Sequence, residues 1–278
     1  MKPSENYSSE YEDYARVKAT YYEGGKFNPV SPWGYRNYLR ESTILNLVEK
    51  YANQSLLDFG CASGHTTMLL SEIQRISYCM GIDIAPSFIE SARQSAIKKN
   101  LKNIEFMTLD EYVESESNEY FSVVLCAEVI EHVEDIENLL DTLRLNTTEE
   151  TVFIITTPNL NGDGSLIGRC LRLLRLRKFS PATNFSATAA EEHGDQHVRE
   201  FSAKTLERTL TKNGFIVLEK SGMFLLDSTL SNFVFKIAKR IPGYTKFGKN
   251  SALKLQNHFP IIYRLFGCQL IFVAKQNQ

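Results

Sequence analysis

Short apolar runs alternate with longer amphipathic stretches along most of this chain. The apolar runs have the length of β-strands, and they cover residues 56–59, 78–82, 104–108, 121–125, 152–156, 215–219 and 270–274. The stretches between them predict helices over residues 33–51, 66–75, 86–100, 136–145 and 203–213. Pro86 and Gly214 fit these boundaries, because proline is favoured in a first helical turn and glycine directly after a helix. The alternation predicts a doubly wound α/β fold with a mostly parallel sheet.

Two long stretches interrupt the alternation. Residues 159–201 separate the fifth predicted strand from the next helix, and residues 221–266 separate the sixth strand from the last one. Insertions of this length are usually lids or binding elements, and the first follows the end of a strand, where open α/β sheets bind ligands. We therefore expect an N-terminal helical cap over residues 1–54 and a main domain over residues 55–278. The two helical insertions of that domain would form its substrate side.

The composition excludes several classes of protein. The chain has 278 residues, of which 43% are hydrophobic and 23% are charged, as is usual for a globular domain. No apolar run approaches the ~20 residues that span a bilayer, and the polar N-terminal segment lacks the pattern of a signal peptide. The five cysteines form no metal-ligand pattern, which fits a reducing compartment. We therefore expect a cytoplasmic protein.

The charges are distributed unevenly. The last 51 residues contain eight Lys and Arg and no Asp or Glu. Arg169, Arg172 and Arg175 recur among leucines within residues 165–178, and residues 230–249 repeat this basic and apolar pattern. Basic amphipathic helices bind anionic membranes, which predicts a membrane-peripheral location. The alternative is that both segments pack on the sheet or line an apolar substrate pocket.

The turn after the first predicted strand indicates a cofactor site. Asp58 ends the strand, and Gly60, Ala62 and Gly64 form a small-residue turn before a helix. Small residues let a ligand lie against bare backbone, and the N–H groups that begin the helix point at it. A carboxylate here would repel a pyrophosphate but suits a cofactor with an ammonium and a sulfonium. Ala62 and His65 also break the G-x-G-x-x-G spacing of a dinucleotide site.

The later strand ends continue this pattern. Asp83 ends the second strand, Asp110 follows the third, and residues 126–128 follow the fourth. With these motifs the chain resembles the class I S-adenosylmethionine-dependent methyltransferases over about residues 55–220 and the final strand. The resemblance implies a seven-stranded sheet whose last strand is antiparallel, and S-adenosyl-L-methionine as the cofactor. It implies that Asp83 binds the ribose hydroxyls and Asp110 the adenine amino group. The expected cofactor-binding residues are Asp58, Gly60, Cys61, Ala62, Gly64, Asp83, Ile84, Asp110, Cys126 and Glu128, and Arg36 for the cofactor carboxylate.

A second distinctive segment contains Glu128, Glu131 and His132. If the segment is helical, these residues share one face. Two carboxylates and an imidazole form a candidate metal site for Mg²⁺ or Mn²⁺, and such a metal lowers the pKa of a bound hydroxyl. The alternative is that no metal binds, and then His132, His193 or His197 is the natural general base.

The same segment resembles that of the ubiquinone-biosynthesis O-methyltransferases. It is also similar to that of the small-RNA 3′-terminal 2′-O-methyltransferases, which hold a metal with two Glu, a His and a further distant His, and this resemblance implies His193 or His197 as the distant ligand. The first resemblance implies O-methylation of a hydroxyl on a small or lipid-like metabolite. The alternatives are an RNA ribose 2′-O-methyltransferase and a catalytically silent module that binds a membrane or a partner. The basic and aromatic RNA-binding segments of the small-RNA enzymes are not evident in the sequence, which argues against a nucleic-acid partner.

Overall fold

The computed structural model describes residues 32–115, 119–160, 197–223 and 268–277. Its elements, in chain order, are α2 (Pro32–Tyr51), β1 (Gln54–Phe59), α3 (His65–Ser71), β2 (Ile76–Asp83), α4 (Pro86–Lys98), β3 (Ile104–Thr108), α5 (Leu109–Glu114), β4 (Phe121–Ala127), α6 (Ile136–Leu143), β5 (Thr147–Pro158), α9 (Ala203–Lys212), β6 (Phe215–Met223) and β7 (Gln269–Gln276). Every strand and helix expected from the sequence is present. Helix α5 was not expected.

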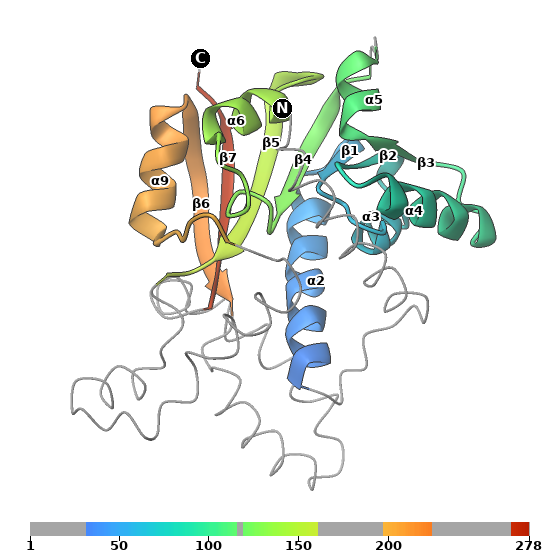
Figure 1. The fold of residues 1–278 in the computed structure, drawn as a ribbon, viewed down its shortest axis with the longest axis horizontal. Coiled ribbons are helices and arrows are strands. Elements are labelled where there is room, and N and C mark those ends of the chain that lie inside the picture. Colours follow the sequence, from blue (N-terminus) through green and yellow to red (C-terminus); the bar gives the residue numbers. More distant parts are fainter. Residues whose placement is uncertain (1–31, 116–118, 161–196, 224–267, 278) are drawn as a thin grey trace, which may run out of the picture.

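The seven strands form one sheet in the order β3-β2-β1-β4-β5-β7-β6 (Figure 1). Strands β1 to β5 pair in parallel, and β7 pairs antiparallel with both β5 and β6. The prediction of a doubly wound, mostly parallel sheet with an antiparallel last strand is therefore confirmed. The strand order reverses between β1 and β4, which is where open α/β sheets bind ligands.

Alternate residues of each strand pack into two different cores. On β1, Leu56 belongs to a cluster with Ile44 and Val48 of α2, whereas Leu57 belongs to a cluster with residues of α5, α6 and α9. The alternation follows from the two-residue period of a strand, which places neighbouring side chains on opposite faces. Helices therefore cover both faces of the sheet, and its central strands are buried.

The described part of helix α2, residues 40–51, contacts the rest of the domain at both of its ends. Its apolar residues pack on β1 and β4, and Lys50 and Tyr51 at its C-terminal end donate hydrogen bonds to Glu219 on β6. At the other end, the carboxylate of Glu41 lies 3.1 Å from His65 Nε2, at the start of α3. The helix thus spans from the first turn after β1 to the far edge strand.

Local signals set most of the helix boundaries. Pro86 begins α4, and Gly214, with φ of 75°, follows α9 as predicted. The unexpected helix α5 begins with a capping box, in which Thr108 Oγ1 accepts from the Glu111 amide and the Glu111 carboxylate accepts from the Thr108 amide. This Thr-x-x-Glu pattern is visible in the sequence and is typical of a helix N-terminus.

The described residues constrain the two insertions only at their ends. Asn159 and Phe201 form an isolated parallel bridge, so the ends of the first insertion meet beside the sheet. The second insertion was predicted to begin at residue 221. Strand β6 instead continues to Met223, because residues 221–223 keep their pairing with β7. Residues 165–178 and 230–249, the predicted membrane-binding segments, lie outside the described residues. Among the described helices, none combines the length and the hydropathy of a membrane-spanning helix.

Candidate active site

The turn after β1 folds back onto the end of β2. The amides of Gly60 and Cys61 both donate to the carbonyl of Ile82, at 2.8 and 2.9 Å. Gly60, Ala62 and Gly64 have positive φ values of 78°, 47° and 74°. Glycine adopts this conformation without strain, whereas Ala62 adopts it against the preference of its side chain. The tight turn therefore brings the start of α3 next to the end of β2.

The two glycines of this turn are required by their neighbours. A Cβ atom on Gly60 would lie 2.3 Å from Val129 Cγ2, and one on Gly64 would lie 2.5 Å from the ring of Phe106. The sequence suggested that these residues leave bare backbone for a ligand. The structure shows that their Cβ positions face side chains of the protein, so they also let two strand-end segments pack closely against the turn.

Asp83 ties this turn to the end of β2. Its Oδ2 accepts from the Ala62 amide at 2.9 Å, and its Oδ1 accepts from the Ala85 amide at 3.0 Å. The residue is 3% exposed. Asp83 therefore holds the turn after β1 and the start of α4 against the end of β2. Ile84, the next predicted cofactor residue, is half-buried beside it.

Asp58 is a buried acid at the end of β1. Its carboxylate accepts from Thr67 Oγ1 at 2.6 Å. Burial raises the pKa of Asp58 to about 6, against the effect of the Thr67 hydrogen bond, and the nearby charge of Asp83 adds to the increase. A cation near these two acids would reverse that increase, because it stabilises the ionised form.

The cysteines of the site are buried and protonated. Burial raises the pKa of the Cys61 thiol well above its usual value, and the neighbouring acids Asp83 and Asp58 add to this. Burial likewise raises the pKa of Cys126, with further contributions from Glu131, Asp58 and Glu128. Neither thiol is therefore suited to act as a nucleophile, since that requires the thiolate. Asp58 contributes to both shifts, so the acid that ends β1 lies near both thiols.

Two predicted cofactor residues have no observed role. Asp110 lies in the first turn of α5 with an exposed side chain. Arg36 lies on α2, and its side chain is outside the described part of the chain. Their assignment to adenine and to the cofactor carboxylate stays a prediction.

The segment after β4 is not helical, which corrects one prediction. Residues 128–135 form bends and turns, and the next helix, α6, begins only at Ile136, where Asp135 Oδ1 accepts from the Asn138 amide. Glu128 has a φ of 57°, and this left-handed conformation turns its side chain away from a common face with Glu131 and His132. Its carboxylate instead accepts from Thr156 Oγ1 at 2.8 Å and from Gln269 Nε2 at 2.6 Å.

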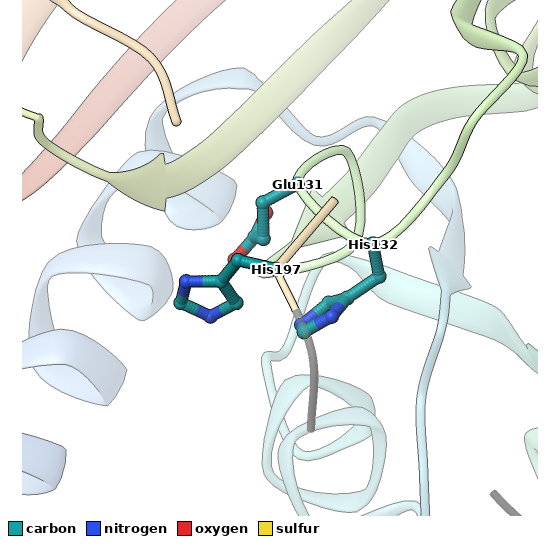
Figure 2. Close-up of side chains that lie close together, drawn as sticks. All are labelled: Glu131, His132 and His197. Atoms are coloured by element: carbon teal, nitrogen blue, oxygen red, sulfur yellow. The ribbon is translucent and has the colours of Figure 1, made fainter. Parts of the chain in front are cut away.

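A different set of three residues comes together at this place. One potential ligand atom from each of Glu131, His132 and His197 lies within 4.8 Å of the others (Figure 2). Figure 2 shows the His197 ring next to the Glu131 carboxylate, and the His132 ring on the other side of His197 from it. The ring centroids of His132 and His197 are 5.0 Å apart. Of the expected set, Glu131 and His132 are joined by His197, one of the two distant histidines named as candidates, whereas Glu128 is absent from the cluster and His193 lies outside the described residues.

The position of this cluster follows from backbone contacts. The carbonyl of Glu131 accepts from the amides of Val198 and Arg199, which brings the end of the first insertion against the turn after β4. The Glu131 side chain is 1% exposed, and its Oε2 accepts from Thr157 Oγ1 at 3.0 Å. The cluster therefore lies at the carboxyl edge of β4 and β5. Val129, between it and Glu128, packs against Gly60 of the cofactor turn.

Comparisons with known proteins identify the family of this chain. A family model described as a methyltransferase domain matches residues 33–220. The ubiquinone biosynthesis O-methyltransferase of Bartonella tribocorum is 26% identical over 159 residues, and that of Rickettsia typhi is 31% identical over 136 residues. These matches cover 53% and 48% of this chain and 63% and 54% of the relatives, which is less than two thirds of the length of each.

A solved structure has the same fold. Phosphoethanolamine N-methyltransferase 2 of Haemonchus contortus, in complex with phosphomonomethylethanolamine and S-adenosylhomocysteine, superposes with a TM-score of 0.61. The match covers 100% of this chain and 62% of that one, at 16% identity. Because the family model covers more than half of the chain and the sheet has the order described above, this protein belongs to the class I S-adenosylmethionine-dependent methyltransferases.

Proposed function

We propose that this protein transfers a methyl group to a hydroxyl oxygen of a small or lipid-like metabolite. The observation that supports this most is the cluster of Glu131, His132 and His197 at the carboxyl edge of the sheet. A hydroxyl group must lose its proton to become a good nucleophile, and these side chains can accept it. The names of both curated relatives include O-methyltransferase, which supports the same reaction type.

The cofactor turn fits S-adenosylmethionine by its charge. The buried acids Asp58 and Asp83 flank the turn, so the site favours a ligand with positive groups. S-adenosylmethionine carries a methyl group on a positively charged sulfur, and the acceptor oxygen attacks the methyl carbon from the side opposite the sulfur. The oxygen–carbon bond forms as the carbon–sulfur bond breaks, and S-adenosylhomocysteine leaves. In this assignment Asp83 accepts hydrogen bonds from the ribose hydroxyls, and Asp58 stabilises the cationic end by its charge.

The protein supplies alignment and proton removal. Alignment of two reactants can contribute roughly 7–11 kcal/mol to the barrier. His132 or His197 accepts the hydroxyl proton on an imidazole nitrogen. Glu131 is buried within 4.8 Å of both rings and stabilises the imidazolium that results.

The same three residues form a second candidate, a divalent metal site. A carboxylate and two imidazoles are a donor set for Mn²⁺, Fe²⁺ or Zn²⁺ more than for Mg²⁺. A metal there would lower the pKa of the acceptor hydroxyl. The donor spacing, within 4.8 Å, is what favours this candidate over the set Glu128, Glu131 and His132.

One experiment tests the proposed reaction and separates these two candidates. Purified protein is incubated with methyl-labelled S-adenosylmethionine and with lipid and soluble extracts, and labelled products are identified. We expect a methyl ether product, and we expect Glu131→Gln and His132→Asn to lower kcat about 100-fold or more while S-adenosylhomocysteine affinity stays within twofold. Glu134→Gln, an exposed neighbour in the same segment, is the matched control.

The outcomes of this experiment are distinct. Loss of turnover in EDTA and its recovery with Mn²⁺ support the metal, and unchanged turnover in EDTA supports a histidine base. Labelled product only on nitrogen or carbon contradicts the proposal. Product on RNA with a binding affinity that falls steeply with salt favours the ribose methyltransferase instead. Tight S-adenosylhomocysteine binding without any labelled product favours the catalytically silent module.

We further propose that the acceptor is reached at a membrane surface. The basic amphipathic pattern of residues 165–178 and 230–249 supports this. Co-sedimentation with anionic vesicles, with and without residues 165–178, tests it. Equal co-sedimentation of both forms contradicts a role for that segment.

A further inference from the structure

Gln269 is a buried polar residue at the edge of the sheet that carries the cofactor turn. It opens β7, where it pairs with Pro158 at the end of β5 and with Met223 at the end of β6. The residue is 2% exposed. Because β7 runs antiparallel to β5, its first residue lies at the carboxyl edge of the parallel strands. Gln269 therefore lies among the strand ends, beside the segment after β4.

The contacts of Gln269 fix the direction of its amide. Its Nε2 donates to Glu128 Oε2 at 2.6 Å, and the other oxygen of Glu128 accepts from Thr156 Oγ1 at 2.8 Å. An ionised carboxylate only accepts hydrogen bonds, so the amide nitrogen must face Glu128. The amide oxygen is thereby turned away from Glu128.

This oxygen has an unused hydrogen-bonding capacity. Gln269 Oε1 is buried and accepts no hydrogen bond from the residues that the structure describes. Buried acceptors are almost always paired, because burial removes the water that would otherwise pair them. The neighbouring Glu128 adopts a left-handed conformation that ordinary residues disfavour. An unpaired acceptor in this setting favours a ligand that brings its own N–H or O–H group.

The position of Gln269 assigns that group to the methyl acceptor. The cofactor turn follows β1, and β4 and β5 lie between β1 and β7. At about 4.8 Å per strand, β7 lies roughly 14 Å from β1. Gln269 is thus on the half of the edge that is further from the cofactor turn.

Gln269 and the histidine cluster lie on different sides of β5. Thr156, which shares Glu128 with Gln269, and Thr157, which contacts Glu131, are consecutive residues of one strand. Consecutive strand residues point to opposite faces. A group bound at Gln269 is therefore a different group from the hydroxyl that His132 and His197 deprotonate.

We propose that Gln269 selects the acceptor by accepting a hydrogen bond from a second N–H or O–H group of the acceptor, separate from the hydroxyl that is methylated. This rests on the proposed function. It restricts the substrate class to compounds that carry, besides the methylated hydroxyl, a second N–H or O–H group on a non-adjacent atom, far enough away to reach the other side of β5. Gln269 acts in binding, and the proton is removed elsewhere.

The test uses Gln269→Leu in the full-length protein, with two matched variants. Gln276→Leu changes the same residue type at the other end of the same strand, where Gln276 Nε2 donates to Thr147 Oγ1 at 2.7 Å. Thr156→Val removes the other hydrogen bond to Glu128 but leaves the amide oxygen of Gln269 in place. The assay measures methyl transfer from labelled S-adenosylmethionine to the acceptors that the wild-type protein methylates in the extracts. Calorimetry measures the affinity of each variant for S-adenosylhomocysteine.

We expect Gln269→Leu to raise KM at least tenfold for acceptor substrates that contain a second donor group, and to lower kcat less. The S-adenosylhomocysteine affinity should stay within twofold, as in Gln276→Leu. Thr156→Val should raise this KM less than Gln269→Leu does, because only Gln269→Leu removes the acceptor oxygen. An analogue of the acceptor substrate in which the second donor group is methylated should show the same KM with the wild-type protein and with Gln269→Leu.

Each other outcome is decisive. Wild-type transfer with unchanged KM in Gln269→Leu overturns this inference and leaves the proposed function intact. A tenfold loss of S-adenosylhomocysteine affinity in Gln269→Leu overturns it as well, because the donor would then be the ammonium of the cofactor. Equal effects of Gln269→Leu and Thr156→Val show that Gln269 acts only by positioning Glu128. The absence of any transfer by the wild-type protein contradicts the proposed function itself.

Discussion

Glu41 on α2 and His65 at the start of α3 lie 3.1 Å apart, between Oε1 and Nε2, with only 11% and 13% of their side chains exposed. His65 directly follows Gly64, the last residue of the cofactor turn. The contact therefore fastens the N-terminal helix to the turn that is expected to bind the cofactor. Its two members are 24 positions apart in the sequence, so neither one indicates the other.

The pair is shielded from solvent, but Glu41 Oε1 accepts no hydrogen bond from the described residues, so we expect the Glu41–His65 contact to contribute at most about 1 kcal/mol to stability. Glu41→Ala, His65→Ala and the double variant are compared with wild type by denaturant unfolding. The two single changes should sum to more than the change in the double variant. Additivity within about 0.3 kcal/mol shows that the two side chains are not coupled.

Asp83 is expected to be the residue on which cofactor affinity depends most. Asp83→Asn keeps the volume but removes the charge and one acceptor, so one of the amides of Ala62 and Ala85 loses its partner. We expect S-adenosylhomocysteine affinity, measured by calorimetry, to fall at least about tenfold, which is about 1.4 kcal/mol. Asp141→Asn, which changes an exposed acid on α6, is the control. Equal affinities of the two variants contradict the assignment.

Gly64 is expected to tolerate alanine less well than Gly214, although both have φ near 75°. Each alanine should lose about 1–2 kcal/mol from the left-handed conformation. At Gly64 the new Cβ also meets the Phe106 ring at 2.5 Å, whereas at Gly214 the nearest atom is Arg144 Nη2 at 3.5 Å. Gly64→Ala should therefore destabilise the protein by about 1–3 kcal/mol more than Gly214→Ala.

The Phe106 contact can be tested separately. Combining Gly64→Ala with Phe106→Leu should recover part of the lost stability, because the smaller side chain gives room to the new methyl group. Thermal unfolding of both single variants and the double variant measures this. If Gly64→Ala and Gly214→Ala destabilise equally, packing against Phe106 does not explain the glycine.

Local patterns were sufficient to predict the framework of this fold. Apolar runs gave the strands, and Pro86 and Gly214 marked helix boundaries through their backbone preferences. Asp83 was expected at the end of the second strand, and it ends β2 there. Because parallel strands bring their carboxyl ends to one edge, it lies next to the turn after β1 and accepts from the Ala62 amide.

Side-chain direction after β4 could not be predicted in the same way. Spacing suggested one helical face for Glu128 and Glu131, but the positive φ of Glu128 turned its carboxylate to Thr156 and Gln269. His197 joined Glu131 because amides from the insertion donate to the Glu131 carbonyl. Both contacts join residues far apart in the chain. Gln269 had no signal beyond a polar residue before the last apolar run.

Asp58 should make the stability of the ligand-free protein depend on pH. Its pKa is about 6 in the folded protein against an ordinary value of 3.8. As pH rises from 3.8 to about 6, the unfolded chain loses this proton first, so the folded state is progressively destabilised. At 1.36 kcal/mol per pKa unit, this difference lowers the free energy of unfolding by about 3 kcal/mol well above pH 6 and has no effect well below pH 3.8.

Asp58→Asn removes this group and should raise the melting temperature at pH 7 by several degrees relative to wild type, with little difference near pH 4. Thr67→Val should do the opposite at pH 7, because the Thr67 hydroxyl stabilises the ionised carboxylate. Melting curves of the three proteins between pH 4 and pH 7.5 measure this. Parallel pH profiles for wild type and Asp58→Asn contradict the raised pKa.

Cofactor binding should reverse the effect, and this connects the buried acid to function. S-adenosylhomocysteine carries an ammonium, which favours the ionised form of Asp58 and lowers its pKa in the complex. Because binding then releases a proton from wild-type protein near pH 5, affinity should increase between pH 5 and pH 7.5. In Asp58→Asn that increase should be smaller, and the affinity at pH 7.5 should be lower than in wild type. Asp58 would then destabilise the ligand-free protein but stabilise its complex with the cofactor. If Asp58→Asn raises the melting temperature and leaves the affinity at pH 7.5 unchanged, Asp58 does not contribute to cofactor binding.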